Sequence, residues 1–544
     1  MRLAELFQSW RRAFRRGGNL WLILSLLLCT LILIPLATVI LSIGVAGPKW
    51  EHIVSTVLAQ YIVNTILLVG IVLFFSMLMA IPSAWLVSAF DFPGRRILEW
   101  ALVLPLAIPT YVAAFVYIQI PELSIPFLVY VRHTWGIEAF AMTEVILRYT
   151  VLALFMASVL FPYLFITMRA SFCRQNRSFI EAALMLGRSP TNVFFTVALP
   201  MARPAIVAGL SLILMEVMND YGAVNFFGVP TLTEGIFRTW FGLEDSASGI
   251  RLAGFMMLAI LFILFIEHLQ RGKARYTSRN VTGMPLARRK LKGLSLTGAY
   301  VVCLIPLSMG LLFPVGQLIL WAIGAARQSL PVFRDWQALN SLLMSFGSAI
   351  LLTGVAVILA YAVRLHPFKW LRGMTRLATL GYAVPGVAVA LGVMTFTGML
   401  DRNINLPVLL SGSLFAIVFA YLVRFIAVPM QSVQAGMTRV CGSLDEASRM
   451  LGHGPGFTLW NINIPLLRGT LVASCMLVFI DILKELPLTM LLRPAGFDTL
   501  AVSAFGMAKE GRIYECAFPS LMIVLIGTIG LCVLNRLIER DLTQ

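Results

Sequence analysis

The sequence contains little charge. Only 12% of its 544 residues are charged, 59% are hydrophobic, and the mean hydropathy is +0.88. A soluble chain needs more charge to cover its surface, so a soluble globular protein is excluded and a lipid bilayer is the expected solvent. Apolar runs of about 20 residues recur along the chain, and each is long enough to cross a membrane as a helix. Because backbone groups in lipid must hydrogen-bond within their own segment, the runs predict an all-α integral membrane protein.

Several chemical signatures are also missing. The seven cysteines include no CxxC pair, which excludes a disulfide framework or a cysteine zinc site. The five histidines form no ligand cluster, so no firm metal site is expected. HExxH and GxSxG sequences are absent, which argues against a membrane enzyme. Without a GxxxxGK[ST] phosphate loop, the chain is expected neither to hydrolyse ATP nor to bind a cofactor.

The charge that is present is mostly positive, with a formal net charge of +17. If both termini lie inside, most of the 42 Lys and Arg residues fall in the short inner segments. This positive-inside pattern predicts a multi-pass protein with cytoplasmic N- and C-termini, and a bacterial inner membrane is its expected location. A nucleic-acid surface would need the basic residues on one folded face, so no nucleic-acid partner is expected.

Twelve membrane spans are predicted. The first follows a basic cluster at residues 11–16 and is too long for a signal peptide, so it is expected to be retained. The spans are placed at residues 20–45, 61–88, 97–119, 144–168, 205–227, 249–268, 298–322, 342–363, 377–399, 408–431, 470–492 and 517–535.

The chain contains an internal repeat whose copies stand 265 residues apart, without a gap from an inner loop into the following span. Upstream the register slips, and the first copy has extra length around 120–143. Both copies have six spans, so two parallel halves related by a pseudo-twofold axis are expected. The first half is assigned to 1–268, a basic cytoplasmic linker to 269–294 and the second half to 295–544. The linker is expected to be attracted to anionic headgroups, although an ordinary positive-inside loop is the favoured explanation.

Each copy carries one motif in the inner loop between its fourth and fifth spans. A short helix is predicted before Gly187, because this glycine and Pro190 are helix stop signals. Such a helix can dock in a groove of a partner. An interfacial hairpin without a partner is the alternative. The motif comprises Glu181, Ala182, Ala183, Gly187 and Pro200 in the first copy, and Glu446, Ala447, Ser448, Gly452 and Pro465 in the second.

The motif resembles the coupling-loop signature of ABC importer permeases, in which the short helix docks on a separate ATPase subunit. The resemblance implies a pore-forming subunit with the type I importer permease fold, both halves being fused in one chain. It also implies two copies of a cytoplasmic ATPase, which carries ATP and Mg, and an extracytoplasmic substrate-binding protein as partners. Ser448 departs from the family pattern. Because serine is small, docking is expected to survive, with unequal coupling as the alternative.

Ionisable residues interrupt the fifth and eleventh spans. They are costly at membrane depth unless they line a pore or pair with one another. The i, i+4 spacing places Glu216 and Asp220 on one helix face, and their repeat counterparts have the same spacing. A translocation pathway and a structural salt bridge of Lys484 both remain open, whereas Arg424 is expected to snorkel to the inner surface. The predicted pathway residues are Glu216, Asn219, Asp220, Asp481, Lys484 and Glu485.

Over nearly its whole length the chain resembles the fused ferric-iron permeases of the ABC family, on stretches that include residues 219–224, 231–236 and 484–489. Ferric ion is a hard cation that favours carboxylate oxygen, as the span carboxylates would provide. Thiamine, phosphonate and polyamine permeases share parts of these stretches, so their substrates are alternatives. An ion-coupled carrier with two parallel six-helix halves is a further alternative.

Overall fold

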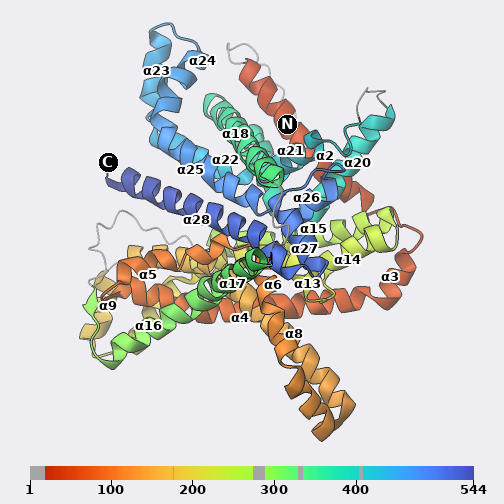
Figure 1. Cartoon of the computed structure of the whole chain (residues 1–544). Coiled ribbons are helices and arrows are strands. Elements are labelled where there is room, and N and C mark those ends of the chain that lie inside the picture. The colour runs from red at the N-terminus through yellow and green to blue at the C-terminus, as the bar shows by residue number, and fades with distance from the viewer. Residues whose placement is uncertain (1–18, 176, 274–287, 329–334, 404–408, 544) are drawn as a thin grey trace.

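The computed structural model describes residues 19–175, 177–273, 288–328, 335–403 and 409–543. The basic cluster before the first span and the linker residues 274–287 lie outside this part. Nearly all regular structure in the described residues is helical (Figure 1). The exception is a parallel pair of two-residue strands, β1 (Phe90–Asp91) and β2 (Arg289–Lys290).

The helices follow one another closely along the chain, and short 3-10 or π turns join some of them. The first half has α2 (Asn19–Ser42), α3 (Trp50–Thr56), α4 (Leu58–Ala89), α5 (Arg95–Ala101), α6 (Thr110–Tyr117), α7 (Gln119–Leu123), α8 (Ile125–Arg174), α9 (Arg177–Met185), α10 (Pro190–Val193), α11 (Leu199–Met201), α12 (Arg203–Asn219), α13 (Gly222–Phe226), α14 (Leu232–Phe237) and α15 (Ser246–Lys273). The second half has α16 (Leu294–Leu307), α17 (Phe313–Arg327), α18 (Asp335–Leu365), α19 (Lys369–Ala378), α20 (Gly386–Asn403), α21 (Leu414–Phe425), α22 (Ala427–Arg439), α23 (Gly442–Met450), α24 (Pro455–Thr458), α25 (Ile464–Leu483), α26 (Pro487–Leu492), α27 (Leu500–Lys509) and α28 (Ile513–Thr543).

The described residues contain eight continuous helices that are long and apolar enough to cross a membrane, and four bent pairs of helices that bring the total to twelve. These twelve segments coincide in order with the twelve spans predicted from the sequence. The prediction of an all-α membrane protein with two sets of six spans is therefore confirmed.

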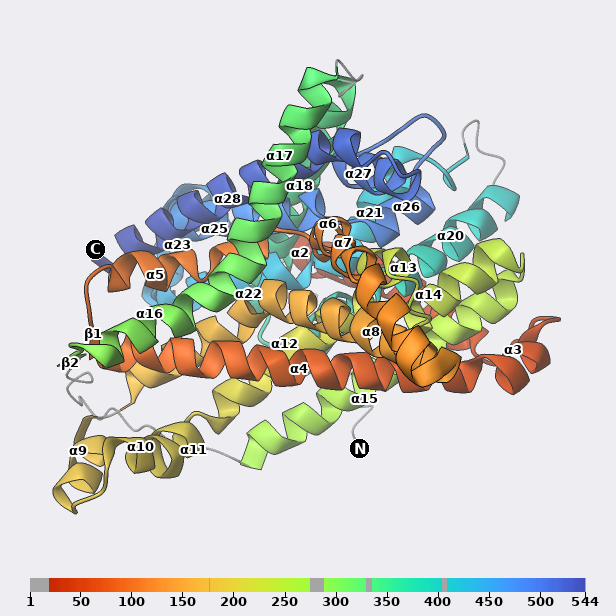
Figure 2. The same ribbon diagram turned by 60° about the horizontal axis from the view of Figure 1, so that its bottom comes forward.

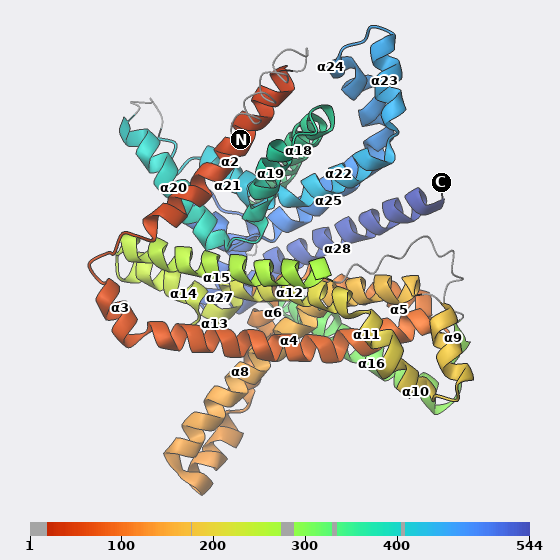
Figure 3. The same cartoon turned by 180° about the vertical axis from the view of Figure 1, so that it is seen from behind.

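The bundle has two distinguishable ends. The short helices α9 and α23 lie at one end together with the C-terminal end of α28, and we call this the coupling end (Figure 1). Helices α3 and α14 lie at the opposite end, as the view from behind also shows (Figure 3). Each half thus brings its motif-bearing loop to the same end of the molecule.

The two halves are interleaved because the first helix of each half packs against helices of the other half. Helix α2 packs on α18 and α20 of the second half, while α16 packs on α4 of the first half (Figures 1 and 3). Gly392 allows this approach, since a side chain there would collide with the carbonyl of Pro35. The first half also contacts the segment just after α16, where the hydroxyl of Tyr117 in α6 donates to the Met309 carbonyl at 2.6 Å.

The extra length of the first half forms a helical hairpin. Gly136 has φ of 90° and ψ of −179°, so α8 is two helices joined by a turn at this residue. The hairpin projects from the side of the bundle, towards the bottom of Figure 1. Along the direction that joins the two ends of the bundle, its tip stops short of α3 (Figures 1 and 2). Its position agrees with the insertion expected around 120–143.

Two span predictions need correction at their ends. The fifth span was expected to run to residue 227 and the eleventh to residue 492, but α12 ends at Asn219 and α25 ends at Leu483. In both halves the chain then leaves the helix and begins a second short helix, α13 or α26. The carboxylates predicted to share one face of a continuous helix therefore stand on either side of a break.

Candidate translocation site

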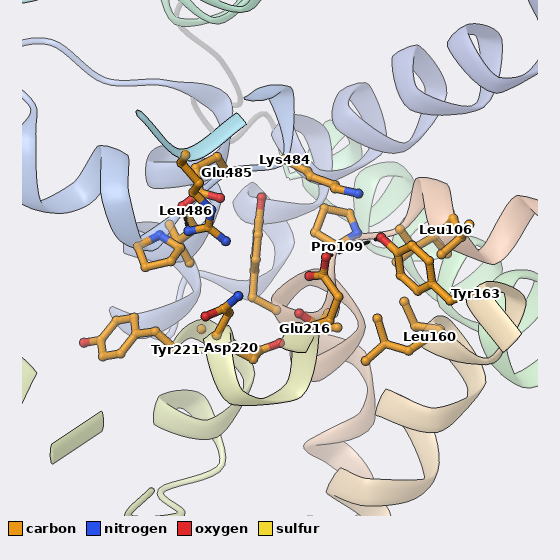
Figure 4. A pocket seen from close by; sticks show the side chains of 18 residues that line it. Leu106, Pro109, Leu160, Tyr163, Glu216, Asp220, Tyr221, Lys484, Glu485 and Leu486 are labelled. Carbon is orange, nitrogen blue, oxygen red and sulfur yellow. Dashed lines mark hydrogen bonds and ion pairs between the residues drawn. The ribbon is translucent and has the colours of Figure 1, made fainter. Parts of the chain in front are cut away.

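A small cavity of about 90 Å³ lies where the two halves meet. The ends of α12 and α25 contribute to it from the two halves, and α8 and α21 contribute one aromatic and one basic side chain (Figure 4). The polar residues that line it are Thr110, Tyr111, Tyr163, Glu216, Asn219, Asp220, Arg424, Lys484 and Glu485.

One carboxylate in each half caps the short helix that follows the break. Asp220 Oδ1 accepts a hydrogen bond of 2.8 Å from the backbone N–H of Ala223. Glu485 Oε1 accepts one of 3.2 Å from the backbone N–H of Leu488 at the same repeat position. A carboxylate oxygen satisfies a first-turn N–H that has no partner inside its own helix. The break is thus built into the sequence of both copies.

The two capping carboxylates differ in their second partner. Asp220 has the neutral Thr110 side chain as a neighbour in the cavity lining. The position equivalent to Thr110 is Gly386, where a Cβ atom would collide with the Arg424 guanidinium. Arg424 uses this space to pair with Glu485, with its Nη1 atom 3.0 Å from Oε1. At this repeat position the first half thus has a neutral polar side chain, whereas the glycine of the second half makes room for an ion pair.

Arg424 is consequently buried, and the expectation that it snorkels to the surface is wrong. Its apolar neighbours in sequence gave no indication of a partner, because Glu485 lies in the break between α25 and α26 and Gly386 at the start of α20. A buried arginine at membrane depth requires a carboxylate. The signal in the sequence that could have indicated this ion pair was one arginine flanked by apolar residues, together with four carboxylates in the spans.

The remaining ionisable groups form a second cluster. Lys484 Nζ lies 2.9 Å from Asp481 Oδ1, while the Tyr163 hydroxyl donates to Glu216 Oε1 across 3.5 Å. Asp481 and Lys484 also line a neighbouring cavity of about 500 Å³, together with Gln431 of α22. That helix leads towards α23, so the larger cavity lies on the side of the coupling end.

The small cavity also holds polar atoms that lack a protein partner. Among the described residues, the Tyr111 hydroxyl and Asn219 Oδ1 are buried and form no hydrogen bond. Native proteins leave few such atoms without a partner, so water or a ligand is expected to reach them. No three His, Cys, Asp or Glu side chains in the described part of the chain are grouped closely enough to hold a metal ion.

The two predicted coupling motifs have the same geometry. Glu181, Ala182 and Ala183 lie in α9, and Glu446 and Ala447 lie in α23. The helices are followed by glycines in the left-handed region, with φ of 81° at residue 187 and 82° at residue 452. Pro200 lies in α11 and Pro465 in the first turn of α25.

Sequence reasoning overlooked the apolar tips of these loops. The side chains of Met185 and Met450 are each 90% exposed, and the leucines that follow them are also exposed. Large apolar side chains that project from a polar surface mark contacts with a partner. Their identity at the same repeat positions was the signal that could have revealed them.

Comparison with known proteins identifies the family. Residues 353–544 match the model of the binding-protein-dependent transport system inner membrane component. The sulfate transport system permease protein CysT of Escherichia coli is 30% identical over 227 residues, which cover 41% of this chain and 78% of CysT. The chain belongs to the family of binding-protein-dependent transport system inner membrane components. It is thus the permease subunit of an ABC importer.

Other relatives of the permease are named for different substrates. The Fe(3+)-transport system permease protein FbpB 2 of Haemophilus influenzae is 27% identical over 531 residues, covering 96% of this chain and 99% of FbpB 2. PhnV of Salmonella typhimurium, named for 2-aminoethylphosphonate transport, is 26% identical over 206 residues, covering 38% of this chain and 76% of PhnV. Membership implies embedding in a membrane and work with a substrate-binding protein and an ATPase. It argues against the ion-coupled carrier.

The first coupling loop of the permease rests on aromatic side chains. The ring of Trp85 in α4 lies 5.1 Å from that of Phe172 and 5.1 Å from that of Phe194. The helix that follows this loop is bent by 68° at Ala202, between α11 and α12. Apolar packing and a bend therefore connect this loop to the membrane helices.

The second coupling loop rests on polar side chains instead. Arg364 of α18 pairs with Asp445 of α23, with Nε 2.7 Å from Oδ2. Ser448 and Thr458 share a hydrogen bond of 2.7 Å, and the Tyr361 hydroxyl donates to the carbonyl of Pro455 at 2.8 Å. The apolar segment from Pro455 to Leu483 is one continuous span. A polar network and an unbroken helix therefore support this loop.

Proposed function

We propose that this permease imports ferric iron across a bacterial inner membrane. The relative FbpB 2 supports the substrate, because the similarity extends over nearly the full length of both chains. The cavity between the halves carries the proposal, because its acidic side chains outnumber its basic ones.

A hard cation fits the chemistry of this cavity. Ferric ion prefers carboxylate oxygens, and Glu216, Asp220 and Glu485 all present such oxygens to one small space. Arg424 and Lys484 hold two of the span carboxylates in ion pairs, which lowers the attraction for a passing cation. An ion in transit must be bound weakly enough to leave.

An oxyanion such as sulfate or a phosphonate is the second candidate. It is favoured by Arg424 and Lys484 in the lining and by the relatives CysT and PhnV. However, each of these cations already has a carboxylate within 3.0 Å. An oxyanion would have to break these pairs and would leave carboxylates exposed to its own charge, so we favour the cation.

The proposed mechanism couples this cavity to ATP hydrolysis on another subunit. Two copies of a cytoplasmic ATPase would bind the loops containing α9 and α23, which places the coupling end in the cytoplasm. Closure of the ATPase pair would move both loops and open the pore towards the substrate-binding protein outside. Hydrolysis would then return the pore to its inward-facing state, in which the cavity of about 500 Å³ receives the ion.

Co-purification and ATPase assays test the proposal. The permease is extracted in detergent, co-purifying subunits are quantified, and ATP hydrolysis is measured with binding proteins loaded with ferric ion, sulfate or 2-aminoethylphosphonate. Two ATPase copies per chain and stimulation by the ferric-loaded protein alone are expected. Stimulation by an oxyanion-loaded protein alone would overturn iron but keep the importer.

A variant separates the pathway from the coupling loops. Asp220→Ala is expected to lower uptake of radiolabelled iron in proteoliposomes while the ATPase remains bound, because Asp220 lies in the cavity and far along the chain from α9. Unchanged uptake would show that the cavity is not the pathway. Loss of the ATPase would show that the substitution damages the fold.

A further inference from the structure

A second cavity, distant from the translocation site, lies at the joint between the two halves. It has a volume of about 700 Å³ and is formed by the turn between α4 and α5 and by the strand β2 just before α16. Figure 2 shows β1 and β2 side by side at the end of the bundle that holds α9. Four basic side chains line this cavity, namely Arg95, Arg96, Arg288 and Lys290.

Three of these cations lack a counter-charge among the residues that the structure describes. Within the described part of the chain, Arg96, Arg288 and Lys290 form no ion pair, and all three side chains are exposed. The one acidic residue in the lining, Asp91, approaches only Arg95, at 3.8 Å. Positive charge is therefore in excess in the cavity and is free to meet an anion.

Arg95 gives the cavity a fixed inner wall. It is buried, and its Nη1 atom contacts Glu99 at 2.6 Å and the Val87 carbonyl at 3.2 Å. Its Nε atom has no hydrogen-bond partner among the described residues. Nε faces Asp91 Oδ1 at 3.8 Å, beyond hydrogen-bond distance, so a closer acceptor from a ligand would satisfy this buried N–H.

The turn between α4 and α5 and the end of the linker are held together by the strand pair β1–β2, so the cations do not lie on independent segments. Asp91 lies opposite Lys290 in the register of the parallel strands, and the Leu291 N–H donates to the Asp91 carbonyl at 3.1 Å. The Tyr300 hydroxyl of α16 donates to the Pro93 carbonyl at 2.8 Å. The cavity is thus built from both halves of the chain.

Two exposed apolar side chains belong to, or directly follow, the segments that form this cavity. Ile97 lines it and is 72% exposed, and Leu294 at the start of α16 is 89% exposed. Ile97 lies in the first turn of α5 and Leu294 begins α16, and both helices belong to predicted membrane spans. A ligand with an anionic head and an apolar tail would match this arrangement of cations beside exposed apolar surface.

We infer that the cavity binds the phosphate of an anionic phospholipid of the inner leaflet. Guanidinium groups donate to phosphate oxygens in a fork, and Lys290 adds a point charge. The assignment to the inner leaflet rests on the proposed function, because only that proposal places the coupling end in the cytoplasm. Free phosphate shares the same chemistry but would not use Ile97 or Leu294.

The second half provides a matched control. Arg372 in α19 is the repeat counterpart of Arg96, and Lys369 and Arg376 lie on the same helix. All three are exposed, and no strand of the linker covers them. Removing these three charges changes the net charge of the permease as much as removing Arg96, Arg288 and Lys290.

Native mass spectrometry of the purified permease tests the inference. The protein is titrated with phosphatidylglycerol, phosphatidylcholine and inorganic phosphate, in parallel with R96Q/R288Q/K290Q and with K369Q/R372Q/R376Q. We expect saturable binding of phosphatidylglycerol that weakens at least about tenfold in the first variant, since three cations that attract anionic lipid are lost. The control variant should bind as the unchanged permease does. Melting temperatures of all three proteins should agree, because every substituted side chain is exposed.

Three outcomes would overturn the inference: equal binding by the first variant, an equal loss in the control, or phosphatidylcholine bound as tightly as phosphatidylglycerol. Inorganic phosphate that competes at the same concentration as the lipid would assign the site to free phosphate instead. The titration uses neither ATPase nor iron, so failure of the proposed function leaves its result unchanged.

Discussion

The two coupling loops present the same surface but are supported differently. Helices α9 and α23 have bounds that differ by the repeat offset, each is followed by a left-handed glycine, and each exposes a methionine at its tip. Behind these surfaces the first loop packs on Trp85 and the second is tied to Arg364. The exposed surface thus keeps its geometry in both copies, as the proposed docking of two identical ATPase subunits requires, whereas its support follows the helices of its own half.

The difference in support predicts a difference in stiffness. A span bent by 68° can change its angle with little loss of packing, while an unbroken helix carries a displacement of its end along its length. The first loop is therefore expected to move partly independently of its span, and the second to move with α25.

The largest effect is expected from proline at the shared glycines. Gly187→Pro and Gly452→Pro each demand φ near −65°, whereas the native values are 81° and 82°. Both should reduce uptake in proteoliposomes to background while membrane insertion, followed by fractionation, is unchanged. Glu181→Lys should do the same by reversing charge in α9. Asparagine at either glycine is the control, since it tolerates the left-handed region. Normal uptake in a proline variant would refute the coupling role of that loop.

The next effect compares the two capping carboxylates. Arg424→Ala leaves Glu485 buried without its counter-charge and should destabilise the permease by about 3–5 kcal/mol. Thr110→Ala removes only a neutral polar neighbour of Asp220 and should cost about 1 kcal/mol. Thermal unfolding in detergent measures both. The double variant Arg424→Ala/Glu485→Gln should recover much of the loss, and equal costs at the two sites would contradict the assigned ion pair.

A third effect should be confined to one loop at a time. Arg364→Ala removes the ion pair to Asp445 and should loosen residues 442–450 by about 1.5–3 kcal/mol. Trp85→Ala should instead loosen residues 177–185, through lost packing of similar size. Hydrogen exchange of the two loops, read by mass spectrometry, distinguishes them. If both substitutions affected both loops, the supports would not be independent.

The smallest effect concerns the serine that departs from the family pattern. Ser448→Ala should cost about 0.5–1.5 kcal/mol because it removes the hydrogen bond to Thr458. Adding Thr458→Val reproduces the Ala183 and Val193 pair of the first loop and should recover most of this loss. Melting temperatures of the single and double variants give the coupling energy. A double variant less stable than Ser448→Ala would show that the polar pair has no apolar equivalent in this loop.

Features set by local pattern could be predicted from the sequence. The spans follow from apolar runs, and the coupling loops follow from a glycine and a proline at fixed distances, because membrane insertion and helix termination depend on neighbouring residues. The ends of α12 and α25 at the site could not be placed, since Asp220 and Glu485 have the spacing of a continuous helix. Their role as caps depends on where the chain turns next.

Features that depend on distant residues were beyond the sequence. Arg424 is buried only because Gly386 leaves space and Glu485 supplies charge, and the three residues lie on different elements. The exchange of α2 and α16 between the halves also has no local signal, because both helices are uniformly apolar. The assigned boundaries at residues 268 and 295 remain predictions about the order of the chain, not about which helices pack together.

The fusion of the two halves changes what their interface must do. Two separate subunits would have to associate at their cellular concentration, and every unfavourable charge at the interface would weaken that association. Halves joined by one chain instead face each other at an effective concentration that short connections raise to about the millimolar range. The interface that carries Glu216, Asp481 and Lys484 can therefore be only marginally stable and still remain assembled. It is free to rearrange during transport without the risk of dissociation.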